Sequence, residues 1–134
     1  MAVIDASVYV ALVSEHEEAH KGSWDWFQQA ITNREKIIAP AIILAEVGAA
    51  ISRGVDDPSL AHRIVQELEI SKIIQITPIP LPLAKRAAAI AIDNKIRGCD
   101  AIYVALAERE ATSLITLDRQ QLERSANIVM TKSP

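Results

Sequence analysis

Ala2-Val3-Ile4-Asp5-Ala6-Ser7 opens the chain with a short apolar run that ends in an acid. Four more short apolar runs follow: Lys36 to Ala39, Ile73 to Ile76, Ser113 to Leu117 and Asn127 to Met130. Apolar runs without polar alternation are typical of strands that are buried on both faces of a sheet. We therefore predict five buried strands.

Helical patterns lie between these runs. They are predicted over residues 7–13, 15–31, 40–53, 58–69, 83–97, 100–110 and 119–124. Pro40 suits the first turn of one helix, and Gly54 follows its end. Asp57 and Pro58 suit the N-cap and first position of the next, and Gly98 is expected to end the helix over 83–97. The alternation predicts an α/β fold whose mostly parallel sheet carries helices on both faces.

Length and composition narrow the class of protein. The 134 residues predict a single domain over 1–134, and the net charge of −3 gives no support to a strongly basic surface. Cys99 is the only cysteine, so no internal disulfide forms, which fits a reducing compartment. No signal peptide or membrane span is visible, since the uncharged stretch 73–84 is short and contains three prolines. A cytoplasmic protein is expected.

Four acids stand in apolar surroundings: Asp5, Glu46, Asp100 and Asp118. An ionised carboxylate is costly there unless it is paired or binds a cation. Asp5 and Asp118 follow strands, where the carboxyl edge of a parallel sheet binds ligands. If all four converge, a hard divalent cation is the simplest relief of their repulsion, because it prefers oxygen ligands.

Each acid also has a purely structural explanation. Asp118 with Gln121 three residues later suits a capping box, and Asp100 suits an N-cap. Glu46 is harder to explain in this way, because it lies in mid-helix. Its neighbours one turn away are all apolar: Ile42, Ile43, Ala49 and Ala50.

Two hydroxyl residues accompany the acids. Ser7 and Thr116 each lie two positions from an acid, in Asp5-Ala6-Ser7 and Thr116-Leu117-Asp118. Along an extended segment such residues point the same way. Their hydroxyls are candidates to hold a carboxylate, a water on a metal ion or a phosphate oxygen, although a cap or turn hydroxyl is the ordinary alternative.

Four motifs together resemble a PIN domain: Val3-Ile4-Asp5-Ala6-Ser7, Ala45-Glu46-Val47, Cys99-Asp100-Ala101-Ile102-Tyr103-Val104-Ala105-Leu106-Ala107 and Leu114-Ile115-Thr116-Leu117-Asp118. The resemblance extends in order over essentially the whole chain. The length of the chain is also similar to that of the VapC-type toxins of toxin–antitoxin pairs. The resemblance implies a three-layer α/β/α sandwich and a Mg²⁺- or Mn²⁺-dependent endoribonuclease.

The resemblance also implies roles for the predicted residues. Asp5, Glu46 and Asp100 are expected to hold the principal metal, with Asp118 completing its shell or a second site. Ser7 and Thr116 match accessory polar positions. The reaction implied is hydrolysis of an RNA phosphodiester by in-line attack of water, which leaves a 5′-phosphate. The partners implied are RNA, a small antitoxin and a second copy of the chain in a homodimer, with no membrane.

Other functions remain open at this point. A receiver-like signalling module also has an acidic Mg²⁺ site, but it needs adjacent acids after the first strand and a functional lysine near Lys132. A phosphatase with Asp5 as nucleophile lacks its second carboxylate here. A PIN ribonuclease of RNA processing and an inactive PIN scaffold are further alternatives. Seven basic residues are candidates for RNA contact, and the sequence does not distinguish among them: Arg53, Lys85, Arg86, Lys95, Arg97, Arg119 and Arg124.

Overall fold

The computed structural model describes residues 1–134. Its five strands are β1 (Ala2–Ile4), β2 (Ile37–Pro40), β3 (Ile74–Thr77), β4 (Ser113–Ile115) and β5 (Thr131–Lys132). Its seven helices are α1 (Ala6–Val13), α2 (His20–Thr32), α3 (Ile42–Gly54), α4 (Pro58–Glu69), α5 (Leu81–Asn94), α6 (Gly98–Arg109) and α7 (Arg119–Ser125).

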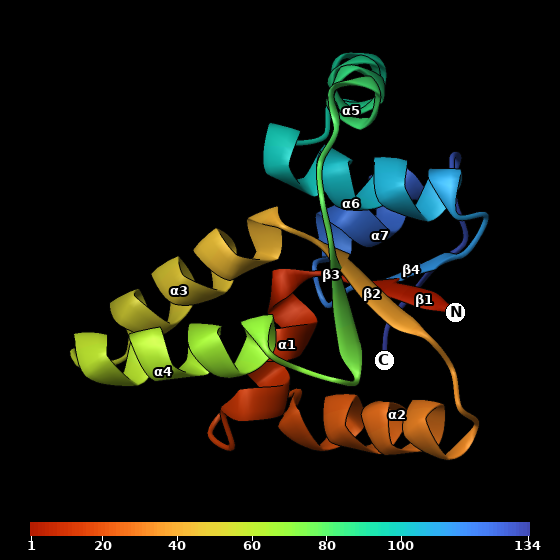
Figure 1. Cartoon of the computed structure of the whole chain (residues 1–134). Helices are drawn as coiled ribbons and strands as arrows, with labels where there is room; N and C mark the ends of the chain where they lie inside the picture. Colours follow the sequence, from red (N-terminus) through yellow and green to blue (C-terminus); the bar gives the residue numbers. More distant parts are fainter.

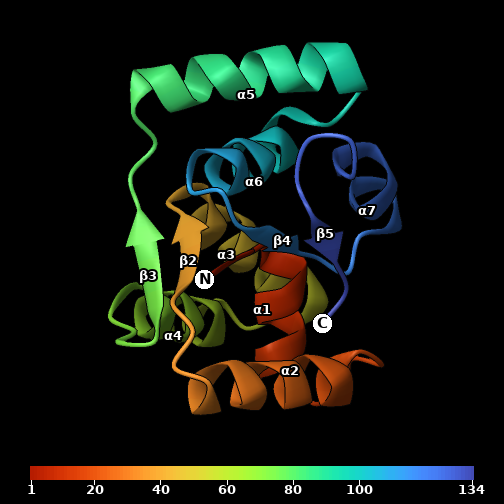
Figure 2. The same cartoon turned by 90° about the vertical axis from the view of Figure 1, so that its right-hand side faces the viewer.

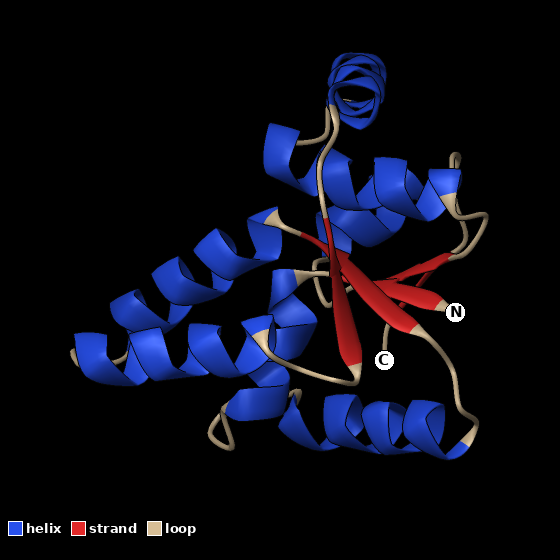
Figure 3. Ribbon diagram, viewed as in Figure 1, coloured by secondary structure: helices blue, strands red, loops and turns tan.

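The strands form one sheet in the order β3-β2-β1-β4-β5, and every pairing is parallel. Helices α1 to α4 lie on one side of the sheet and α5 to α7 on the other (Figures 1 and 3). The predicted three-layer α/β/α sandwich is therefore confirmed.

The register of the central strands positions the acids. Parallel pairing of β1 with β4 sets Val3 beside Leu114 and Ile4 beside Ile115. Asp5 and Thr116 are the next residues of these strands, so they leave the carboxyl edge of the sheet as neighbours. Ligands of parallel α/β sheets bind at this edge.

Helix α6 forms the centre of the core. It packs against β1, β2 and β4, and Tyr103, Val104 and Leu106 are fully buried. In Figure 2, α5 crosses over the outer side of α6, so α6 is covered on both sides. This double coverage explains why α6 has no broad polar face. No helix has both the length and the apolar composition needed to cross a membrane.

The prediction of the last strand was wrong. Ile128 and Val129 donate their amides to the carbonyl of Ser125, so this segment closes a turn after α7. The ladder begins later, where the amide of Leu114 bonds to Met130 and that of Thr116 to Lys132. Ile128 and Val129 contact the core without belonging to a strand.

Two helix boundaries also differ from the prediction. Pro40 ends β2, and α3 begins two residues later at Ile42. Helix α5 ends at Asn94, where Lys95 adopts the left-handed conformation that was expected of Gly98. Gly98 instead begins α6. The break between α5 and α6 therefore comes earlier than the glycine indicated.

The predicted start of α2 was wrong. The helix begins at His20 rather than near residue 15, and it buries Ser23 and Ala30. Trp24 and Ile31 are exposed, while Phe27 packs against the core. Ser23, Phe27 and Ala30 are four and three residues apart, so they share the face of α2 that meets the core.

Candidate functional site

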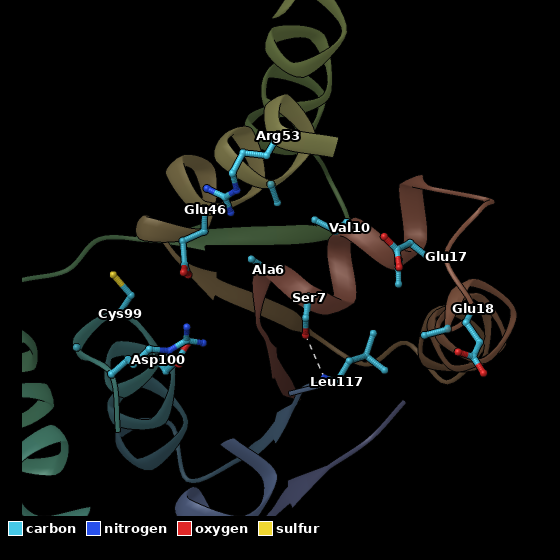
Figure 4. A pocket seen from close by; sticks show the side chains of 15 residues that line it. Ala6, Ser7, Val10, Glu17, Glu18, Glu46, Arg53, Cys99, Asp100 and Leu117 are labelled. Atoms are coloured by element: carbon cyan, nitrogen blue, oxygen red, sulfur yellow. Dashed lines mark hydrogen bonds and ion pairs between the residues drawn. The ribbon is translucent and has the colours of Figure 1, made fainter. Parts of the chain in front are cut away.

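A cavity of about 720 Å³ opens between α1, α3 and the beginning of α6. Ser7, Glu46 and Asp100 line it together with two arginines, Arg53 and Arg97. Figure 4 shows the side chains of Ser7, Glu46 and Asp100 reaching the cavity from different elements of the fold. Two of the four predicted acids therefore face one open space.

Asp5 is only 4% exposed and is hydrogen-bonded to Ser7, which lines this cavity. It is the N-cap of α1, where its Oδ1 accepts hydrogen bonds from the amide of Val8, at 3.3 Å, and from the Ser7 hydroxyl. Its Oδ2 accepts from the Thr116 hydroxyl. Burial outweighs these hydrogen bonds and raises the pKa of Asp5 to about 6.

Glu46 lies half-buried on α3, and a residue of α6 holds its carboxylate by a hydrogen bond. The Tyr103 hydroxyl donates to Oε1 of Glu46 at 2.6 Å. Burial raises the pKa of Glu46, and the negative charge of Asp100 adds to this effect. Burial and the carboxylate also raise the pKa of Tyr103, so the phenol stays protonated and continues to donate.

Arg97 joins the two remaining acids. Its Nε donates to Oδ2 of Asp100 at 3.0 Å, and its Nη2 donates to Oδ2 of Asp118 at 3.2 Å. The side chain of Arg97 is 75% exposed, so these are surface ion pairs that solvent weakens. The arginine supplies positive charge to the part of the site nearest to solvent.

The two capping predictions had different outcomes. Asp118 caps α7, since its Oδ1 accepts from the amides of Gln120 and Gln121 at 2.8 and 3.2 Å. Gln121 does not complete a capping box, because its side chain donates to the carbonyl of Asp100. Asp100 lies in the first turn of α6 and is not its N-cap, which is Arg97. Asp100 is therefore not explained by capping.

Ser7 and Thr116 both contact the Asp5 carboxylate, although the spacing of Thr116 had indicated Asp118 as its partner. Ser7 reaches Asp5 although the two residues do not lie along one extended segment, because Ser7 belongs to α1. The Ser7 hydroxyl also accepts from the amide of Leu117 at 3.0 Å (Figure 4). The two hydroxyls thus tie the end of β1 to the segment after β4.

A comparison with protein families matches residues 2–127 to the PIN domain. This match covers nearly the whole chain. The chain belongs to the PIN domain family. The family resemblance predicted from the four motifs is confirmed.

Individual PIN proteins are similar over almost their full length. Ribonuclease VapC3 of Pyrobaculum aerophilum is 29% identical, with 95% of this chain and 96% of that protein aligned. The Sarcin-Ricin loop cleaving toxin VapC20 of Mycobacterium tuberculosis superposes with a TM-score of 0.75 at 13% identity, covering 95% of each chain. VapBC2 of Rickettsia felis, bound to a promoter DNA fragment, gives a TM-score of 0.75 at 13% identity, covering 99% and 98% of the two chains.

The acids of this PIN domain have the donor chemistry that a divalent cation needs. Asp5, Glu46 and Asp100 supply carboxylate oxygens, and the charge of Asp100 acts on both of the others. Their spacing in this structure is not that of a bound ion, because no three His, Cys, Asp or Glu side chains stand close enough to hold one. Arg97 pairs with Asp100 instead. The ligand type fits a hard cation, and Arg97 is the cation that Asp100 contacts in this structure.

Sequence reasoning missed two residues of the site. Tyr103 was seen only as part of an apolar helix, although it lies three positions after Asp100 and so on the same helix face. Arg97 was one of seven basic candidates, and its position three residues before Asp100 was the available signal. What the sequence did not give was the partner of each residue elsewhere in the fold: Glu46 on α3 for Tyr103, and Asp118 at the start of α7 for Arg97.

Proposed function

We propose that this PIN domain is a divalent-metal-dependent endoribonuclease and the toxin of a VapBC-type toxin–antitoxin pair. The observation that carries the proposal is the pair Glu46 and Asp100 in one cavity at the carboxyl edge of the parallel sheet, with Asp5 buried against the lining residue Ser7. The PIN family match and the ribonuclease name of the Pyrobaculum relative support the same activity.

The proposed ligands of the metal are Asp5, Glu46 and Asp100, and Asp118 completes the shell or a second site. Mg²⁺ or Mn²⁺ suits an all-oxygen donor set of this size. When bound, the cation offsets the charge of the phosphodiester and lowers the pKa of the attacking water. Carboxylates alone would repel the RNA, so the cation is required for substrate to approach.

The chain itself supplies the positions of these groups. Ser7 on α1 and Thr116 just after β4 both hold Asp5, so its carboxylate cannot rotate freely. Of the seven basic candidates for RNA contact, only Arg53 and Arg97 line the cavity. Their guanidinium groups are therefore the proposed contacts to RNA phosphates, which position a strand without reading its sequence.

Cleavage of labelled RNA by the purified protein tests the proposed activity. We expect cutting with Mg²⁺ or Mn²⁺, none with a chelator, and new 5′ ends that carry phosphate. Asp100→Asn should abolish cutting, because it removes the charge of a proposed ligand. Asp57→Asn is the matched control, since Asp57 only caps α4 and asparagine caps equally well. Equal cutting by Asp100→Asn and wild type would contradict the proposal.

Induction in cells tests the toxin assignment separately. We expect growth arrest that is lost in Asp5→Asn and Asp100→Asn and relieved by a co-expressed antitoxin. RNA cleavage in vitro without any effect on growth would favour the alternative of a PIN ribonuclease in RNA processing. The predicted homodimer is tested by light scattering on the purified chain, where a monomer mass would refute it.

A further inference from the structure

Glu46 makes one hydrogen bond in the structure, and its donor is Tyr103. The two residues come from different layers of the molecule, Glu46 from α3 on one side of the sheet and Tyr103 from α6 on the other. The O···O distance of 2.6 Å is typical of a charge-assisted bond to a carboxylate. The bond engages Oε1 and leaves Oε2 without a protein partner.

Tyr103 is well suited to fix a neighbour in place. Its side chain is fully buried in the core, so the ring has little freedom to move. It also lies one turn after Asp100 on α6, which means that one rigid helix presents both a proposed ligand and the phenol. The distance between Asp100 and the donor for Glu46 is therefore set by helix geometry.

We propose that Tyr103 is a positioning residue that orients the Glu46 carboxylate for cation binding, with Oε1 held by the phenol and Oε2 left for the metal. This proposal rests on the proposed function. Without the hydroxyl, Glu46 would have three rotatable bonds and no fixed partner. Removing a group that orients a metal ligand typically lowers metal affinity or activity by roughly ten- to a hundredfold.

A purely structural role for Tyr103 is the alternative. A buried phenol needs a hydrogen-bond partner in any protein, and Glu46 would then serve only to satisfy it. The two roles differ in what the hydroxyl affects. A structural hydroxyl changes thermal stability, whereas a positioning hydroxyl changes the dissociation constant of the metal in a protein that remains folded.

The test is Tyr103→Phe, measured by Mn²⁺ titration and by the melting temperature of the same sample. We expect the Mn²⁺ dissociation constant to rise by about tenfold or more. Tyr9→Phe is the matched control, because Tyr9 is also buried and is the only other tyrosine, yet makes no hydrogen bond through its hydroxyl. It should bind Mn²⁺ as wild type does.

The double variant Glu46→Gln/Tyr103→Phe tests whether Tyr103 acts through Glu46. If it does, removing the hydroxyl changes Mn²⁺ affinity little once Glu46 is glutamine. Unchanged Mn²⁺ affinity in Tyr103→Phe, or an equal loss in both backgrounds, overturns the proposal. The two proposals can fail separately. If the wild-type protein cuts no RNA but Tyr103→Phe still weakens its Mn²⁺ binding, the positioning role is supported and the ribonuclease activity is refuted.

Discussion

The Thr116 hydroxyl donates a hydrogen bond to the Asp5 carboxylate across 111 residues of sequence. The pairing of β1 with β4 makes them neighbours, because each residue follows a matched pair in the two strands. The same hydroxyl accepts from the amide of Asp118 at 3.0 Å. Thr116 therefore links an acid at the end of one strand to the acid that caps α7.

Thr116→Val should destabilise the protein by roughly 1–3 kcal/mol, because a buried carboxylate oxygen loses its donor while the side-chain volume is kept. Chemical denaturation measures the change. Thr32→Val is the control, since the Thr32 hydroxyl bonds to the carbonyl of Gln28 on an exposed helix face. That variant should change the free energy of unfolding by less than about 0.5 kcal/mol. Equal effects at both positions would contradict the proposed importance of Thr116.

The stability of the metal-free protein should fall as the pH rises through the pKa of Asp5. The folded-state pKa of about 6 exceeds the usual 3.8, so the folded protein binds the proton more tightly than the unfolded chain does. Stability from this group is full below about pH 4 and is lost above about pH 6, by up to about 3 kcal/mol.

Urea unfolding in a chelator at several pH values measures this loss. Asp5→Asn lacks the titrating group. Its free energy of unfolding relative to that of wild type should therefore increase from pH 4 to pH 7. Mn²⁺ at pH 7 should stabilise wild type more than Asp5→Asn. Parallel pH profiles of the two proteins would show that Asp5 is not the group responsible.

Sequence reasoning located the acids but not their partners. Asp5 and Asp118 could be placed because the ends of parallel strands share one edge, and strands of this kind are visible as apolar runs. The bond from Tyr103 to Glu46 spans 57 residues and depends on how α3 and α6 pack. No local pattern carries that information.

The end of α5 and the position of the last strand were mispredicted because nearby residues favoured a different local structure. Gly98 looked like a helix end because glycine adopts positive φ without strain, yet Lys95 adopts a φ of 55° three residues earlier. The segment 127–130 looked like a strand because it is apolar. Its amides instead complete the turn after α7, so backbone hydrogen bonding decided its conformation.

Substitutions of Asp118 should separate capping from function. Asp118→Asn keeps an oxygen to cap α7 and should unfold close to wild type, whereas Asp118→Ala should lose roughly 1 kcal/mol. Asp57→Ala, at the N-cap of α4, is the stability control and should lose a similar amount. If Asp118 completes the metal shell, both of its variants should cut RNA more slowly. Full cleavage by Asp118→Asn would leave capping as its only role.

Arg97→Gln should bind Mn²⁺ more tightly than wild type, by about two- to fivefold, because the metal no longer competes with a guanidinium for Asp100 and Asp118. Titration at low ionic strength measures the change, and added salt should reduce it, since salt screens exposed ion pairs. Arg86→Gln is the matched control, because Arg86 pairs with Glu108 through two similar bonds away from the cavity. It should leave Mn²⁺ binding unchanged. Weaker binding by Arg97→Gln would mean that Arg97 holds the two acids in position for the metal rather than occupying its place.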